Sequence, residues 1–202
     1  MIIFACIISL FIVNLAPYYI KKEEINVLSS CQDLDLEKVY TKSYIAGSIF
    51  IIAPQLLLFI FSYEYLYQAI FIMLGIAAYF DFKRNWIPDP VIFITIIINF
   101  LYIIHSQSID LKSICLNSVF FTTPYLLLNA LSFAITKKYI FYSGDIYIII
   151  SLSFSVLPLL GFITTVLSIF SALLFMLMTK KREIPYIPFL LISFLASHIA
   201  IS

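Results

Sequence analysis

Charged residues are scarce in this chain, and their scarcity excludes an ordinary water-soluble domain. Only 11% of the 202 residues are charged and 63% are hydrophobic, with a mean hydropathy of +1.07. A soluble domain is nearer a quarter charged and half apolar. Such a chain has too little polar surface to cover a globule in water, so we expect its solvent to be largely lipid.

Net charge and cysteine are also in short supply. The net charge is +1, so the chain carries no bulk positive field for nucleic acid. The three cysteines, Cys6, Cys31 and Cys115, lie far apart and form no CxxC pair. This spacing argues against a structural zinc site and against a disulfide framework. We therefore expect no metal, no cofactor and no nucleic-acid partner.

Linker-like segments, low-complexity stretches and internal repeats are absent from the sequence, which favours a single domain. The apolar N-terminal segment 1–19 lacks the basic residues that precede the core of a signal peptide. Its nearest lysines, Lys21 and Lys22, follow the apolar run instead. We predict that this segment is retained as a first membrane span.

Long apolar runs make up most of the chain and predict an all-α polytopic membrane protein. A hydrocarbon core about 30 Å thick requires roughly 17–25 apolar residues per helix. About eight transmembrane helices are expected, at residues 2–19, 44–62, 65–80, 90–105, 113–135, 144–157, 159–179 and 186–201. Only Pro158 separates the sixth span from the seventh, so these two could also form one kinked element.

The basic residues indicate the orientation of these spans. With the N-terminus outside, 11 of the 12 lysines and arginines fall in inside segments, and only Lys112 falls outside. An excess of positive charge is typical of short cytoplasmic loops. The pattern supports the eight-span count, because merging the sixth and seventh spans would place the basic cluster at 180–182 outside.

Three of the eleven acidic residues, Asp81, Asp89 and Asp145, lie at the edges of predicted spans, whereas the others belong to loops and turns. Asp89 precedes Pro90, and Asp at the N-cap with Pro at the first helical position is a common helix start. Asp81 could be a loop charge balanced by the basic residues after it. Asp145 could be a first-turn carboxylate that the helix dipole favours, with Ser143 as the N-cap.

Asp81 and Asp145 also share one face of the predicted bundle. Two spans lie between them, and an even number of crossings returns the chain to the same side. Both carboxylates therefore reach the inner edge of the membrane, where ionisable groups are costly and are functional candidates by default. A pair of carboxyl groups can act as an aspartic-protease dyad, in which one removes a proton from water and the other polarises the scissile carbonyl. As a first-turn carboxylate, Asp145 is the expected base and Asp81 the expected acid.

Three short segments follow one another in a characteristic order, and the first two contain these aspartates. They are DFKRNWIPD at 81–89, YSGD at 142–145 and EIPYIPFLLISF at 183–194. The first resembles the motif of the type IV prepilin peptidases in which Ile-Pro-Asn/Asp begins six positions after a catalytic Asp. The second resembles the GxGD motif of these membrane aspartic proteases, and the third resembles the segment that opens their last span. The resemblance covers about residues 44–202.

This resemblance implies that Asp81 and Asp145 are catalytic in an aspartic endopeptidase of the bacterial inner (cytoplasmic) membrane. The implied substrates are type IV prepilins or the pseudopilins of type II secretion, whose leader is cleaved at the cytoplasmic face. Tyr142 replaces the first glycine of the motif, and Tyr147 replaces a lysine often found after it. If the family needs that glycine for a positive φ or for a close approach of two backbones, the local geometry of this chain must differ from that of the family. The implied neighbours of the dyad are Ser143, Gly144, Pro88, Asp89, Pro185 and Pro188.

Many members of the family also methylate the new N-terminus, using a larger loop with two zinc-binding CxxC pairs. The corresponding loop here, about 20–43, contains only Cys31, so the resemblance implies a peptidase-only form. We therefore divide the chain into 1–43, the first span with a reduced remnant of the methyltransferase region, and 44–202, the peptidase core. The alternative is a non-enzymatic small transporter or an assembly scaffold, which includes a degenerate family member, although the acids cluster at one face and no repeat is visible.

Overall fold

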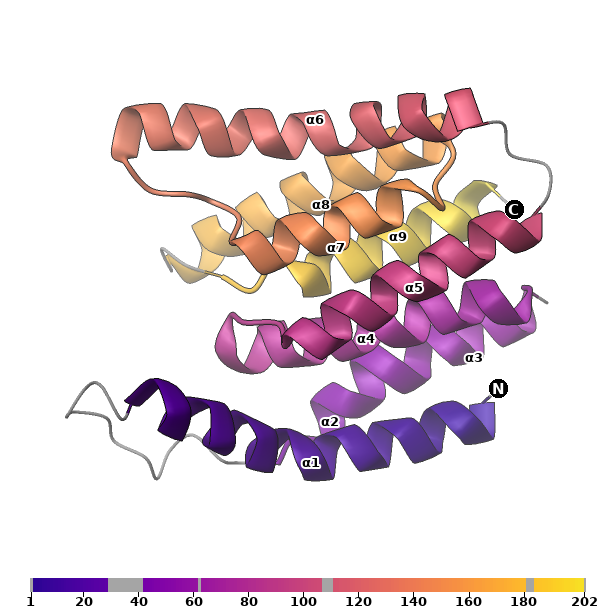
Figure 1. The fold of residues 1–202 in the computed structure, drawn as a ribbon, viewed down its shortest axis with the longest axis vertical. Coiled ribbons are helices and arrows are strands. Elements are labelled where there is room, and N and C mark those ends of the chain that lie inside the picture. Colours follow the sequence, from indigo (N-terminus) through magenta and orange to yellow (C-terminus); the bar gives the residue numbers. More distant parts are fainter. Residues whose placement is uncertain (1, 29–41, 62, 107–110, 181–183, 202) are drawn as a thin grey trace.

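The computed structural model describes residues 2–28, 42–61, 63–106, 111–180 and 184–201, and these residues form helices with no strand among them. The helices lie side by side along one direction (Figure 1). Their bounds are α1 (Ile2–Leu28), α2 (Tyr44–Gly47), the π-helical segment η2 (Ser48–Ile52), α3 (Ala53–Ile60), α4 (Tyr65–Arg84), α5 (Asp89–Ser106), α6 (Leu111–Thr136), α7 (Ser143–Ser153), α8 (Pro158–Thr179) and α9 (Ile187–Ile201). The segments α2, η2 and α3 continue one another, so Tyr44–Ile60 is a single apolar rod.

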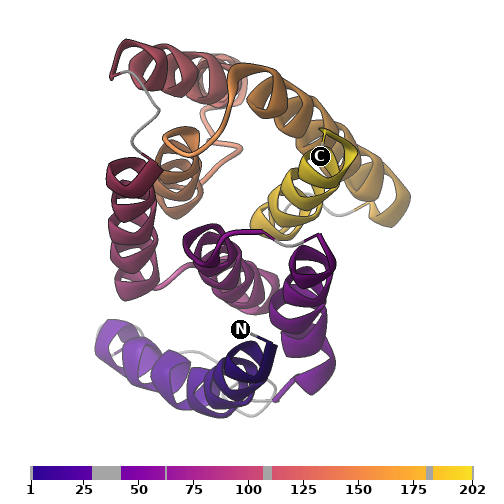
Figure 2. The same ribbon diagram turned by 90° about the vertical axis from the view of Figure 1, so that its right-hand side faces the viewer.

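The central helix of the bundle is α4. Figure 2, viewed along the helices, shows α4 enclosed by α5, α9, the α2–α3 rod and α1, each of which packs against it. Fourteen of its 20 residues are buried. A helix that is apolar on all sides is typical of the interior of a bundle. The helices α6, α7 and α8 complete the bundle on the side away from α1 (Figure 1).

Large hydrophobic side chains cover the outside of the bundle. Examples are Ile3, Phe11, Ile135, Phe162 and Met178, each of which is more than half exposed. A water-soluble monomer rarely presents contiguous apolar surface of this extent. Four helices, α1, α4, α6 and α8, contain stretches that are long and apolar enough to cross a membrane. The prediction of an all-helical protein is confirmed, whereas the number of spans and their orientation stay predictions.

The sixth and seventh predicted spans are two separate helices and not one kinked helix. Helix α7 ends at Ser153, residues 154–157 leave the helix, and Pro158 opens α8. With 11 residues, α7 is about 16 Å long at 1.5 Å per residue, roughly half the thickness of a hydrocarbon core. The first helix is longer than expected, because α1 continues to Leu28. The rest of the first polar loop, including Cys31, lies outside the described residues.

Polar side chains link neighbouring helices inside the bundle. Asn99 on α5 donates a hydrogen bond from Nδ2 to the hydroxyl of Ser151 on α7, at 3.0 Å. The hydroxyls of Thr164 on α8 and Ser197 on α9 lie 2.7 Å apart. Such interhelical bonds average about 0.6 kcal/mol in membrane proteins. They therefore set the register between helices more than they set the overall stability.

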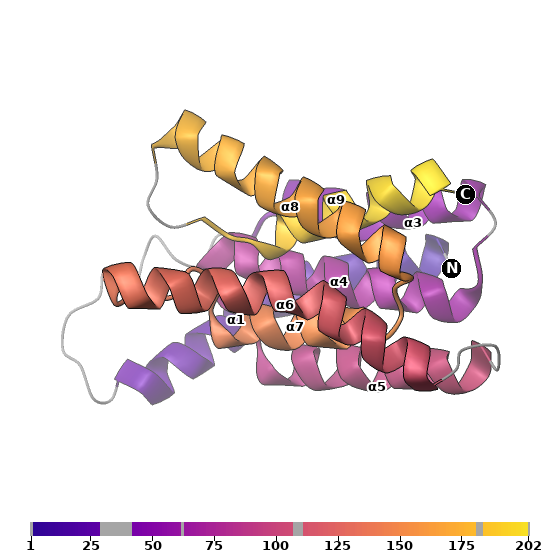
Figure 3. The ribbon, with the colours of Figure 1, turned by 90° about the horizontal axis from the view of Figure 1, so that it is seen from above.

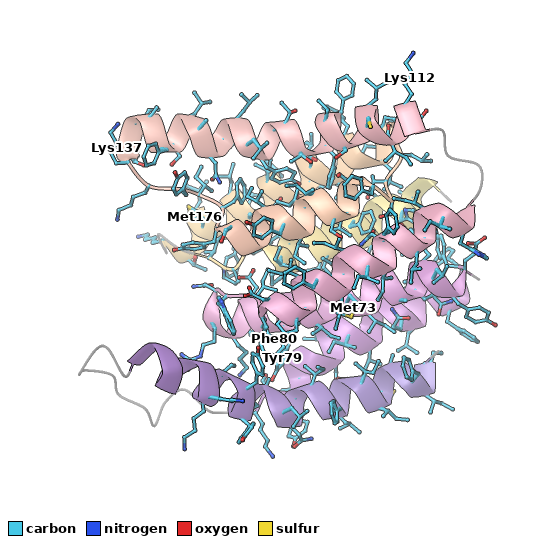
Figure 4. All side chains as sticks on the ribbon, in the orientation of Figure 1. Met73, Tyr79, Phe80, Lys112, Lys137 and Met176 are labelled. Carbon is cyan, nitrogen blue, oxygen red and sulfur yellow. The ribbon has the colours of Figure 1, made fainter. Side chains whose placement is uncertain are left out.

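Most of the described basic residues gather at one end of the bundle, which we call the basic end. It is formed by the last residues of α4, α6 and α8 and by the first residues of α5, α7 and α9 (Figure 1). Lys83 and Arg84 end α4, and Lys180 follows α8. Figure 4 shows Lys137 at this end of α6 and Lys112 at the opposite end. Within the described residues, the distribution matches the one expected from the sequence.

Gly75 allows α4 to pass close to η2. A Cβ atom at this position would clash with the backbone carbonyl oxygen of Phe50, which cannot rotate away. The facing turn is π-helical over Ser48–Ile52. Glycine thus serves a close approach of two backbones at this crossing, as small residues commonly do between membrane helices.

We expect Gly75→Ala to destabilise the purified protein by about 1–3 kcal/mol, because the added methyl group overpacks this crossing. The measurement is the thermal unfolding midpoint in detergent, followed by circular dichroism. Gly144→Ala is the matched control, since a Cβ there would lie 3.6 Å from the nearest side-chain atom, an ordinary contact. Equal midpoints for the two variants would contradict the close approach at Gly75.

Candidate functional site

Asp81 lies in the last turn of α4 and is buried, with 3% of its surface exposed. Its Oδ2 accepts a hydrogen bond of 2.8 Å from the backbone amide of Ile187, the first residue of α9. The first amides of a helix have no partner within the helix, so Asp81 caps α9 from a neighbouring helix. Helix α4 ends at Arg84, and the next residue, Asn85, is its C-cap with a left-handed φ of 51°. The chain turns there toward Trp86, whose ring stacks on Tyr19 of α1 at 6.3 Å.

Asp145 lies in the first turn of α7 and is also buried, with 5% exposed. Its Oδ2 accepts a hydrogen bond of 3.0 Å from the amide of Tyr142. Tyr142 is therefore the N-cap, one position before the expected Ser143, because the carboxylate three residues later closes back onto the Tyr142 amide. Tyr142 has φ −74° and ψ 164°, an extended conformation open to any residue. Tyrosine in place of the motif glycine thus causes no backbone strain.

Asp89 and Pro90 open α5 with a shift of one residue from the expected start. The amides of Val91 and Ile92 donate to the carbonyl oxygen of Pro88, at 2.9 and 3.3 Å. Pro88 therefore takes the cap position, and Asp89 is the first helical residue. Pro88 is buried and Asp89 is exposed. Asp89 thus differs in environment from the two buried carboxylates.

The three segments noted in the sequence meet at the basic end. The Cβ position of Gly144 lies 3.6 Å from the side chain of Ile87, so segment 142–145 packs against segment 81–89. Asp81 in turn reaches the third segment through the amide of Ile187. Asp81 and Asp145 therefore lie in segments that contact one another at this end. Carboxyl groups in this relation can divide the roles of acid and base.

The remaining predicted neighbours mainly shape the backbone. Ser143 is exposed at the start of α7, Pro185 is half-buried and Pro188 is buried. Pro188 is the second residue of α9, where a missing amide hydrogen costs nothing. Glu183, which opens the third segment, lies outside the described residues. Within the described part of the chain, no three or more His, Cys, Asp or Glu side chains gather to hold a metal ion.

Tyr186 connects the third segment to the segment around Asp145, and the sequence analysis missed it. The residue is 5% exposed, and its ring packs edge-on against Phe141, with 4.7 Å between centroids. Its hydroxyl lies 2.7 Å from the hydroxyl of Ser168, which is also 3.2 Å from that of Tyr125. The chain contains 14 tyrosines, so no pattern in the sequence distinguishes this one.

Asn129 on α6 holds the loop that leads to Asp145, and it was also missed. Its Oδ1 accepts hydrogen bonds from the amides of Ile140 and Phe141, at 3.0 and 2.8 Å. Its Nδ2 donates to the carbonyl oxygen of Phe141 at 2.9 Å. One half-buried side chain thus satisfies three backbone groups immediately before Tyr142. The one sequence feature that pointed to Asn129 was a single amide side chain within the apolar run 124–135.

Helix termini do not distinguish the base from the acid in this pair. Asp145 lies in the first turn of α7, and Asp81 accepts the first amide of α9. Both carboxylates therefore lie near the positive end of a helix dipole. The argument that favoured Asp145 as the base applies equally to Asp81.

The chain matches no family model, no curated protein and no solved structure. The resemblance to the prepilin peptidases therefore has its basis in the three sequence segments alone. Their meeting at one end of the bundle is a property of this fold.

We expect Asn129→Ala to loosen the loop before Asp145, because the amides of Ile140 and Phe141 lose their acceptor. Hydrogen exchange at these two amides should accelerate about fivefold, for bonds worth about 1 kcal/mol each. The measurement is exchange followed by mass spectrometry in detergent. Asn117→Ala is the control, since Asn117 lies on the same helix but donates to the carbonyl oxygen of Val156, and exchange at the two amides in this variant should stay near that of the native protein. Unchanged exchange in Asn129→Ala would show that the loop is held by other contacts.

Proposed function

We propose that this protein is a multi-pass membrane aspartic endopeptidase that uses Asp81 and Asp145 to cleave the leader of type IV prepilins or pseudopilins. The observation that carries the proposal is that two buried carboxylates lie at the basic end, in segments that pack against one another. The proposed location is the bacterial cytoplasmic membrane, with the N-terminus outside and the basic end at the cytoplasmic face. Water is the proposed nucleophile.

Helix capping accounts for only part of this arrangement. Ser, Thr or Asn would cap a helix as well as Asp does, without the cost of burying an ionisable group. Both caps instead use an aspartate, and both carboxylates bind their amide through Oδ2. A carboxyl group has a second oxygen that can accept or carry a proton. A capped carboxyl group therefore keeps the means for acid–base chemistry.

In the proposed reaction, one ionised carboxylate removes a proton from water as the water attacks the scissile carbonyl. The other carboxyl group, which is protonated, polarises the carbonyl and then passes its proton to the leaving amine. The N-termini of α7 and α9 favour negative charge at this place. The substrate would place its apolar helix in the inner leaflet and its basic leader at the depth of the two carboxylates. We propose no methyltransferase activity, because a chain with three cysteines cannot supply two CxxC pairs.

Cleavage of a co-expressed prepilin should be lost in Asp81→Asn and in Asp145→Asn, by about 100-fold or more in each case. Asparagine retains an oxygen that can accept the amide of Ile187 or Tyr142, so the caps persist while the acid–base function is removed. The ratio of precursor to mature pilin on an immunoblot measures the effect.

Asp89→Asn is the matched control for these variants, because Asp89 is an exposed first-turn carboxylate at the same end. It should leave cleavage unchanged. Full cleavage by either Asp81→Asn or Asp145→Asn would refute the dyad.

A transporter or an assembly scaffold is the second candidate, and one buried polar group favours it. Asn99 is fully buried, and among the described residues its Oδ1 has no hydrogen-bond partner. Unpaired polar groups at membrane depth commonly line an ion or substrate pathway. Under this alternative the native protein cleaves no prepilin, so the same assay separates the two candidates.

A further inference from the structure

A cavity of about 750 Å³ lies between α6 and α8 at the basic end. The two helices pack closely near their other ends, where the Cβ position of Gly161 is 3.0 Å from the ring of Phe121. They diverge toward their C-terminal ends (Figure 3). The loop 138–142 and the segment 184–186 line the space between these ends. The cavity is thus a consequence of the angle between α6 and α8.

The lining of the cavity is amphipathic. Leu128 of α6 and Ile169, Leu173 and Met176 of α8 contribute to apolar walls. Met176 lies toward the basic end of α8 in Figure 4. Among the described residues that line the cavity, Lys138 is the only charged one, and no carboxylate is present. The cavity therefore offers an apolar interior together with a single positive charge.

The backbone of Lys138 is held at the rim of the cavity. The hydroxyl of Ser132 donates to the carbonyl oxygen of Lys138 at 2.8 Å. The amide of Lys138 donates to the hydroxyl of Thr136 at 3.3 Å. The neighbouring Lys137 instead places its ammonium group over the ring of Phe133, at 5.5 Å. The backbone of Lys138 is thus fixed in position next to the apolar space.

We propose that this cavity binds one anionic phospholipid, with an acyl chain between α6 and α8 and the headgroup phosphate at Lys138. The inference relies on the proposed membrane placement, in which the basic end faces the cytoplasm. Basic pockets between helices on that side suit anionic headgroups, which are concentrated in the cytoplasmic leaflet. An apolar space at this depth is favourably filled by a flexible hydrocarbon chain, because close packing recovers dispersion contacts.

The charge of the cavity disfavours the helix of the substrate as the occupant, because Lys138 would repel a basic leader. An acyl chain with an anionic head fits both the apolar lining and the positive charge.

The bound lipid would contact residues adjacent to both carboxylates. Tyr142 lines the cavity, and its amide binds Asp145. Tyr186 also lines it and precedes Ile187, whose amide binds Asp81. The site is therefore distinct from the carboxylate pair but shares its supporting segments.

The test uses the full chain in detergent after removal of native lipid. Phosphatidylglycerol and phosphatidylcholine with identical acyl chains are added separately, and native mass spectrometry counts the retained molecules. We expect one phosphatidylglycerol to be retained at least fivefold more strongly than phosphatidylcholine. Lys138→Gln should abolish this preference, whereas Lys112→Gln, at the opposite end of α6 (Figure 4), should leave it unchanged.

A photoactivatable phosphatidylglycerol should label segments 128–142, 169–176 and 184–186 in the native protein. Equal retention of the two lipids, an unchanged preference in Lys138→Gln, or labelling confined to other segments would overturn the proposal. Displacement of the lipid by a prepilin peptide would assign the cavity to the substrate instead. The readout is binding, so a failure of the proposed peptidase activity leaves this test intact.

Discussion

The hydrogen bond from the amide of Ile187 to the carboxylate of Asp81 joins the end of the central helix to the start of the last one. In apolar surroundings an uncapped helix start is expensive, because water is not there to satisfy its amides. Asp81 therefore determines where α9 begins. The segment before α9 carries Tyr186, which packs against Phe141 and shares the hydroxyl of Ser168 with Tyr125. The position of the loop before Asp145 thus depends in part on the same bond.

The two aspartates each combine a structural and a potential chemical function. As caps they accept a hydrogen bond from a helix start, and as a dyad they would exchange protons with water and substrate. These demands are compatible because a carboxyl group has two oxygens, and the cap uses one of them. Because both carboxylates bind backbone amides, few other side chains are needed to hold them in place. The backbone of three segments, held by Asn129 and by the contacts of Tyr186 with Phe141 and Ser168, positions both acids.

Hydropathy predicted the helices well, because a chain in an apolar solvent must pair its backbone groups within each segment. The parity of the crossings also predicted that Asp81 and Asp145 reach the same end. Two N-caps lie one residue before the predicted ones, at Tyr142 instead of Ser143 and at Pro88 instead of Asp89. The position of a cap depends on which acceptor each of the first amides finds, and this cannot be read from the sequence. Asn129 and Tyr186 act through contacts with other segments, which leave no periodic trace in a sequence. The cavity between α6 and α8 depends on a packing angle set near Gly161.

Trp86 is the only tryptophan in the chain, and it lies in the loop between Asp81 and Asp89. Its ring stacks on Tyr19 and is 38% exposed. The intrinsic tryptophan fluorescence of the whole protein therefore originates from one ring in the segment 81–89. A change in polarity or packing at this loop appears directly in the emission, undiluted by signal from elsewhere. The molecule thus carries a built-in optical probe of the region where its three segments meet.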